Sequence, residues 1–146
     1  TGFGSVDAAI FANVPLKNDF QLAPNGPITD LLEYDEPDYT LTGTFGINVG
    51  DFRTQATVRY WDGVTPTPSP NRSLSQSSIP SYTVVDLAFR WTLPETDSLT
   101  KDMTLTFNIN NVFDEDPPLN KTNTGGVWPV LSNIGRTFQL GFSKGF

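Results

Sequence analysis

Residues 135–146 read GRTFQLGFSKGF, and they decide the fold because their side chains alternate in character. Large apolar residues occupy one parity, at Phe138, Leu140, Phe142 and Phe146, and small or polar residues occupy the other. A β-strand turns alternate side chains to opposite faces, so this segment predicts a strand with one apolar face and one small, polar face. The ends of soluble domains usually fray. This pattern therefore predicts a terminus that is held in place.

The same alternation recurs in five other segments. The six predicted strands lie near residues 3–16, 39–49, 52–61, 82–91, 103–113 and 136–146. Each has about ten residues, the length that a tilted strand needs to cross a bilayer, whereas strands of globular proteins usually have about five or six. No segment has the periodicity of a helix. The sequence predicts an all-β fold, an antiparallel up-and-down meander of six long strands.

The connections between these strands alternate in length. Residues 50–51 form a tight hairpin turn, and residues 92–102 form a second short connection. The connections at 17–38, 62–80 and 114–135 are longer and rich in Pro, Asn, Ser and Asp. Alternate connections of a meander emerge at the same end of the sheet. Short turns at one end and long loops at the other are typical of an outer-membrane barrel.

Composition excludes several classes of function. The net charge of −7 argues against binding to nucleic acid. The chain has no cysteine and no histidine, which removes disulfides, thiolate chemistry and the commonest general base and metal ligand. No apolar run approaches the roughly 20 residues of a membrane helix. The start at Thr1 resembles neither a signal peptide nor a natural beginning, which suggests a piece of a longer chain.

Aromatic residues gather near the ends of the predicted strands. They are Tyr39, Phe52, Tyr60, Trp91, Phe113 and Phe146. Aromatics at both ends of apolar bands resemble the girdles that lie at membrane–water interfaces. A soluble sheet with one buried face gives the same alternation, so a soluble β-sandwich such as a carbohydrate-binding module is an alternative. The strand lengths and the loop asymmetry favour the membrane barrel.

Catalysis and metal binding have little support in the sequence. Two acidic clusters lie in the long connections, at Asp30, Glu33, Asp35, Glu36 and Asp38 and at Asp114, Glu115 and Asp116. Carboxylates bind Ca²⁺, but neither cluster has the spacing of an EF-hand, so both are interpreted as solvated loops. The stretch NNVFDEDPP, residues 110–118, predicts the end of a strand followed by a turn. We predict no enzyme activity, no cofactor and no metal site.

Several stretches resemble the C-terminal end of the barrel of TonB-dependent outer-membrane receptors. They are SYTVVDLAFRW (81–91), MTLTFNINNVFDEDPP (103–118) and GRTFQLGFSKGF (135–146), preceded by GDFRTQATVRYWDG (50–63). The resemblance implies a barrel of about 22 strands that closes around an N-terminal plug domain. This chain would hold the last six strands, and the plug would lie outside it. A passive porin or an autotransporter translocator is an alternative.

The resemblance also implies a function and its partners. Such a receptor imports siderophores, cobalamin, oligosaccharides or similar large nutrients across the bacterial outer membrane, and TonB energises import through the plug. The partners would be outer-membrane lipid, the barrel-assembly machinery, TonB and the nutrient, with no nucleic acid. Since both neighbouring strands would be missing, we expect the isolated chain to associate through its sheet edges.

The last strand resembles the signal that the barrel-assembly machinery reads. The residues that would carry this signal are Gln139, Gly141, Phe142 and Phe146. Lys144 departs from the pattern, because an aromatic or aliphatic residue is usual there, although lysine can extend its amine to the headgroups. The alternative is that Phe146 is an ordinary aromatic residue of an edge strand.

The polar parity of the strands would line the barrel lumen. It carries Arg53, Arg59, Trp61, Asp86 and Arg90. These side chains are candidates for contact with passing substrate. They are equally candidates for hydrogen bonds to the plug.

Overall fold

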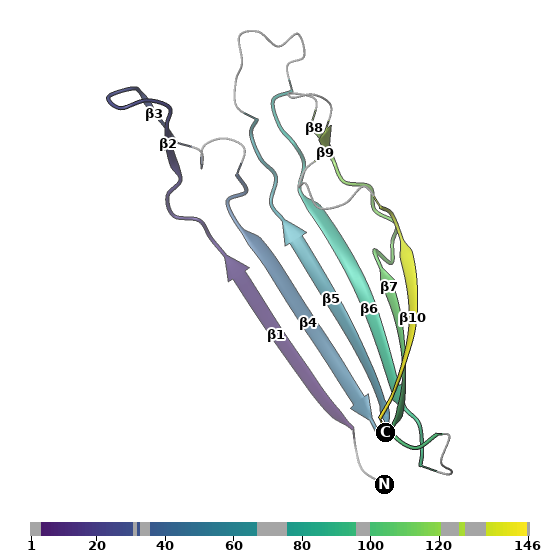
Figure 1. Cartoon of the computed structure of the whole chain (residues 1–146). Helices are drawn as coiled ribbons and strands as arrows, with labels where there is room; N and C mark the ends of the chain where they lie inside the picture. Colours follow the sequence, from purple (N-terminus) through teal and green to yellow (C-terminus); the bar gives the residue numbers. More distant parts are fainter. Residues whose placement is uncertain are drawn as a thin grey trace.

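Six long strands form one antiparallel sheet (Figure 1). The computed structural model describes residues 4–30, 32, 36–66, 76–95, 100–120, 126–127 and 134–145. The strands of the sheet are β1 (Ser5–Asn13), β4 (Thr40–Val49), β5 (Phe52–Trp61), β6 (Tyr82–Thr92), β7 (Met103–Asn110) and β10 (Thr137–Lys144). They lie in the order β1-β4-β5-β6-β7-β10, so each strand pairs with the next long strand along the chain. The predicted six-stranded meander is confirmed.

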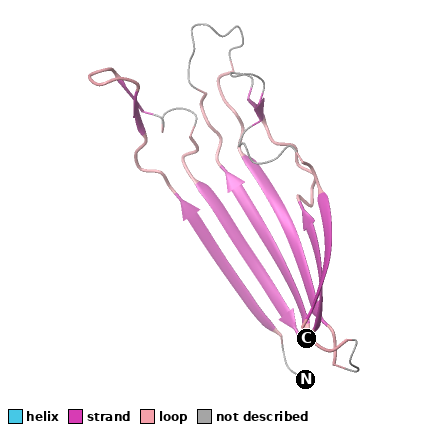
Figure 2. Ribbon diagram, in the orientation of Figure 1, coloured by secondary structure: helices cyan, strands magenta, loops and turns pink. Residues whose placement is uncertain are grey.

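Two small hairpins lie within the long connections. β2 (Asp19–Gln21) pairs with β3 (Ile28–Asp30), and β8 (Leu119–Asn120) pairs with β9 (Gly126–Val127). Figure 1 shows the described parts of the long connections at one end of the sheet and those of the short connections at the other. The described residues contain strands and connections only (Figure 2), and they include no helix that could cross a membrane.

The strand ends differ from the predicted ends where the backbone leaves the extended region. β7 ends at Asn110 rather than near 113, because Asn111 has a φ of 52°. β1 ends at Asn13, before the Val14–Leu16 segment that the alternation included. Gly50 has a φ of 57°, which suits the first position of a primed hairpin turn.

The sheet is a single layer with almost no core. The buried apolar side chains of the described residues are Val64, Ile79, Tyr82 and Val84. The accessible surface is 10458 Å², whereas a compact globular protein of 16.0 kDa exposes about 7,400 Å². A β-sandwich needs two sheets packed face to face. The soluble-sandwich alternative is therefore wrong for the described part of the chain.

The apolar parity forms one broad exposed face. Ile10 is 81% exposed and Leu140 is 84% exposed, and both lie on this face. Four phenylalanines, Phe52, Phe89, Phe107 and Phe138, form a ladder across β5, β6, β7 and β10, with successive ring centroids 6.1–6.3 Å apart. Cross-strand aromatic pairs of this kind stabilise a sheet by about 0.2–1 kcal/mol each. The ladder joins four strands on the apolar face.

Candidate functional site

The polar face carries a hollow of about 610 Å³ at the end of the sheet with the long connections. We call it the wall groove. The end of β5, the start of β6, the end of β7 and the start of β10 form it. The residues that line it include Arg59, Trp61, Tyr82, Asp86, Asn110, Asn111, Thr137 and Gln139. Most of these residues belong to the polar parity of their strands, so the alternation of the sequence places them together.

An ion pair lies across the groove between β5 and β6. Nη2 of Arg59 lies 2.5 Å from Oδ2 of Asp86, and the two side chains reach each other diagonally across the ladder. The other carboxylate oxygen of Asp86 accepts a hydrogen bond from the backbone N–H of Asn111 at 2.9 Å. Nε of Arg59 is buried and has no hydrogen-bond partner among the described residues. Asp86 therefore neutralises the guanidinium and also fixes the turn after β7.

An aromatic pair forms the second part of the groove. Trp61 and Tyr82 are directly opposite each other in the ladder, with ring centroids 5.7 Å apart and planes inclined by 27°. Tyr82 is 7% exposed, and its hydroxyl donates a hydrogen bond to the carbonyl of Glu115 at 3.1 Å. The phenol thus holds the turn after β7 against the start of β6. Trp61 is only partly buried.

The turn after β7 is built from side chains that bond to backbone. The amide of Asn111 donates to the carbonyl of Glu115 and accepts from its N–H, both at 2.9 Å. Asp114 has a φ of 58°, and its carboxylate accepts from the N–H of Arg136 at 2.6 Å, just before β10. Asn and Asp tolerate the left-handed region better than other residues with side chains. The strand end and turn predicted from NNVFDEDPP are confirmed.

Arg53 lies away from the wall groove, near the short turn at 50–51. Its guanidinium forms an ion pair of 2.7 Å with Asp7, and this pair passes over the intervening strand β4. The crossing point is Gly46, which lies opposite Asp7 in the ladder. A Cβ there would lie 2.7 Å from Nη2 of Arg53 and from both carboxylate oxygens of Asp7. A glycine in β4 thus allows β1 and β5 to share an ion pair.

We predict that Gly46→Val separates Arg53 from Asp7 and lowers the thermal unfolding midpoint of the full-length receptor in detergent. The loss should be small, because the ion pair is partly exposed. Asp7→Asn removes the same ion pair, so the unfolding midpoint of the double variant should fall by less than the sum of the two single decreases. Gly43→Val is the control, since a Cβ at Gly43 contacts nothing within 4 Å. Full additivity of the two effects would contradict the prediction.

The five predicted lumen residues fall into two groups. Arg59, Trp61 and Asp86 meet in the wall groove. Arg53 and Arg90 are directly opposite each other in the ladder at the far end of the sheet. Arg90 is exposed and makes no ion pair within the described part of the chain. Sequence parity places all five residues on one face of the sheet. The register of the strands then places them at opposite ends of that face.

The predicted assembly residues lie on both faces of β10. Gln139 and Gly141 are on the polar face, and Gln139 lines the wall groove. A Cβ on Gly141 would lie 2.7 Å from the hydroxyl of Thr106 on β7. Phe142 is on the apolar face and is 77% exposed. Phe146 lies outside the residues that the structure describes.

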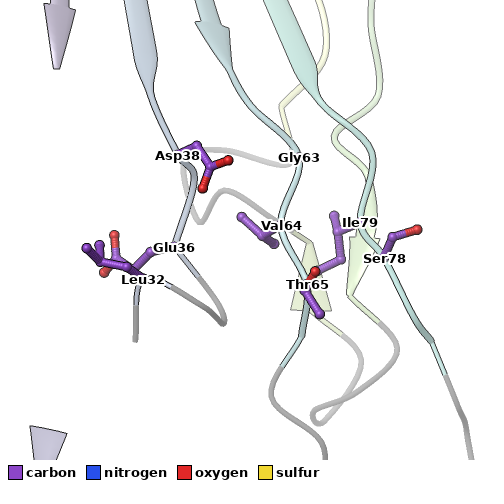
Figure 3. Close-up of a pocket in the computed structure, with 8 residues that line it drawn as sticks. All are labelled: Leu32, Glu36, Asp38, Gly63, Val64, Thr65, Ser78 and Ile79. Carbon is purple, nitrogen blue, oxygen red and sulfur yellow. The ribbon is translucent and has the colours of Figure 1, made fainter. Parts of the chain in front are cut away.

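A smaller pocket of about 220 Å³ lies among the long connections (Figure 3). Glu36 and Asp38 line it together with apolar and small residues near Val64 and Ile79. Glu36 accepts a hydrogen bond from the amide of Asn18 at 3.0 Å. Of the first acidic cluster, Glu33 and Asp35 lie outside the described residues. The described residues contain no group of three acidic side chains placed to hold a metal ion.

Sequence reasoning missed three residues of these sites. Tyr82 shares the parity of Asp86, and this parity could have placed it on the lumen face, but its role depends on a hydrogen bond to the turn after β7. The sequence placed Asn111 in a turn but showed no partner for it. Its side chain bonds to the backbone of Glu115, and a residue pattern does not reveal such a contact. Asp7 is the only acidic residue on the polar parity of β1, and this signal could have pointed to a partner for Arg53.

The comparisons with known proteins agree with this geometry. A family model described as TonB dependent receptor-like, beta-barrel, matches residues 12–112. The chain belongs to this family. No curated protein and no solved structure gives a significant match. The matched segment runs from the end of β1 to the turn after β7, so it includes four of the six long strands in full.

Membership in the TonB-dependent receptor family decides between the classes considered above. The family is a family of transporters rather than of enzymes, and its barrel domain implies the bacterial outer membrane. TonB and a transported ligand are the partners that the family implies. The porin and autotransporter alternatives are wrong, because the family match assigns the barrel to a different class.

Proposed function

We propose that this chain is the C-terminal barrel segment of a TonB-dependent active transporter. It would supply the last six strands of a barrel of about 22 strands. The imported nutrient would be a siderophore, cobalamin, an oligosaccharide or a similarly large molecule. The observation that carries the proposal is the family match over residues 12–112, joined to a single-layer meander with one polar and one apolar face.

The two faces of the sheet support this assignment. The apolar face is exposed on every strand and would contact outer-membrane lipid. The polar face would line the lumen, where Arg53, Arg59, Trp61, Asp86 and Arg90 would contact the nutrient or the plug. The plug domain, which would contact TonB, would lie outside these residues.

Energised uptake tests the proposed function. Cells that carry the full-length receptor should take up its nutrient only when TonB and the proton gradient are both present. Uptake of radiolabelled candidate nutrients, with and without TonB, measures this dependence. Cells with the receptor gene deleted serve as the control. Uptake that continues at the same rate without TonB would contradict active transport.

The assembly role makes a separate prediction. In the full-length receptor, removal of Phe146 should lower the level in isolated outer membranes several-fold, because the barrel-assembly machinery would no longer find the terminal aromatic. Phe138→Ala is the matched control: Phe138 is on the apolar face of the same strand and stacks on Phe107, with ring centroids 6.3 Å apart. Immunoblots of outer-membrane fractions measure both variants. Equal levels of the two variants would contradict the prediction.

A further inference from the structure

The wall groove is lined by apolar residues and by groups that both donate and accept hydrogen bonds. The apolar residues include Val84, Pro117, Ile134 and Phe138. Asn110 and Gln139 are amides, and Thr137 carries a hydroxyl that already accepts a hydrogen bond from Asn110 at 3.0 Å. An amide offers a carbonyl acceptor and two N–H donors, and a hydroxyl offers both functions on one atom. Such a lining matches a ligand whose own polar groups are hydroxyls.

The groove offers no free charge to a ligand. Among the described residues that line it, Arg59 is the one cation and Asp86 the one anion, and Nη2 of Arg59 lies 2.5 Å from Oδ2 of Asp86, so each neutralises the other. An anionic ligand would need an unpaired cation, and a cationic ligand would need an unpaired carboxylate. The lining therefore favours a neutral, polar ligand.

The connections around the groove disfavour anions further. The three long connections carry ten carboxylates and three basic side chains, so their net charge of −7 equals that of the whole chain. The two connections that border the groove, 62–80 and 114–135, carry four of these carboxylates and two basic side chains. Three of these carboxylates, Asp114, Glu115 and Asp116, belong to the turn beside the groove. Like charges repel an approaching anion, and this repulsion is strongest where low-dielectric walls focus the field.

The aromatic pair adds an apolar surface to this polar lining. Trp61 stacks on Tyr82 and is the less buried of the two rings. A sugar ring has an apolar face of C–H groups and a rim of hydroxyls, so it can pack on an aromatic ring while its hydroxyls bond to neighbouring amides. A volume of about 610 Å³ is large enough for more than one sugar ring.

We infer that the wall groove binds a neutral oligosaccharide on its way through the barrel. This inference rests on the proposed import function and narrows its substrate to one class. Trp61 provides the stacking surface, and Asn110 and Gln139 provide hydrogen bonds to sugar hydroxyls. Arg59 and Asp86 hold the groove in shape.

Calorimetric titration of the full-length receptor in detergent tests this inference. The probes are maltohexaose, cellohexaose, xylohexaose and mannohexaose, with ferric citrate as an anionic chelate for comparison. At least one hexasaccharide should bind, and Trp61→Leu and Gln139→Ala should each weaken its binding about tenfold. Ser143→Ala is the control, because Ser143 is on the polar parity of the same strand as Gln139, at its opposite end. The control should leave Kd unchanged.

The outcomes separate this inference from the proposed function. If no hexasaccharide binds, or if one binds equally well to the Trp61→Leu and Gln139→Ala variants, the groove is not a sugar site. TonB-dependent uptake of ferric citrate that neither variant alters would overturn the sugar site and leave active transport standing. Uptake that does not need TonB would overturn active transport, and the titrations would still decide the groove.

Discussion

The isolated 146-residue chain will form oligomers or filaments in detergent-free buffer rather than remain a monomer. β1 and β10 are the edges of the sheet, and each presents a row of backbone donors and acceptors without a paired strand. The face beside these edges is apolar and exposed on both of them, at Ile10 on β1 and at Phe142 on β10. Edge pairing with other copies satisfies the backbone and covers part of this face.

A closed monomeric barrel is not an alternative for these residues. The smallest bacterial single-chain barrels have about eight strands, and that number leaves an interior just wide enough for side chains. Six strands cannot close around Trp61, Tyr82 and the two ion pairs of the polar face. The sheet must therefore find its missing neighbours in another molecule.

Light scattering measures the mass of the isolated chain, and infrared spectroscopy shows whether its strands persist. The control is the same chain refolded into lipid vesicles, where lipid covers the apolar face and only the edges remain unsatisfied. We expect association in both environments, with larger assemblies in buffer. A monodisperse monomer in buffer with full strand content would contradict the prediction.

The alternation of the sequence was sufficient to predict the main sheet, for a physical reason. A strand with one face in lipid and one in a hydrated lumen must change polarity at every residue, so its pattern persists over its whole length. Phe138, Leu140 and Phe142 show this on β10. The two-residue turn at 50–51 and the position of the long connections then determine the order of the strands.

The contacts between strands were beyond such a prediction. The ion pair of Arg53 with Asp7 depends on the register of three strands and on a glycine at position 46, and no local pattern encodes that combination. The short hairpins β2–β3 and β8–β9 were also missed, because two or three residues are too few to show alternation. Local patterns predict which face a residue lies on, while register determines what it touches.

Asn111→Ala should destabilise the full-length receptor by about 2–4 kcal/mol, which is a large effect for one side chain. Asn111 is 6% exposed and makes two hydrogen bonds with the backbone of Glu115. Alanine removes both bonds and leaves the N–H and the carbonyl of Glu115 without these partners. It must also adopt the φ of 52° that asparagine tolerates better.

Two further variants separate these causes. Asn111→Gly should lower the free energy of unfolding by about 1 kcal/mol less than Asn111→Ala does. Glycine removes the same hydrogen bonds, but it adopts a positive φ without strain. Asn108→Ala is the control, because Asn108 is the same residue type on the polar parity of β7, within the strand rather than in the turn. Urea unfolding in lipid vesicles measures all three variants. Equal losses for Asn111→Ala and Asn108→Ala would show that the side chain of Asn111 does not hold the turn.

The same substitution links the fold to the wall groove. Asn111 lines the groove, its backbone N–H bonds to Asp86, and its side chain holds Glu115, whose carbonyl accepts the hydrogen bond of Tyr82. A turn that loosens in Asn111→Ala should therefore release both the aromatic pair and the ion pair from their fixed positions. We expect ligand affinity to fall in this variant at urea concentrations that leave the barrel folded. Affinity that falls only when the barrel unfolds would show that the turn stabilises the sheet without shaping the groove.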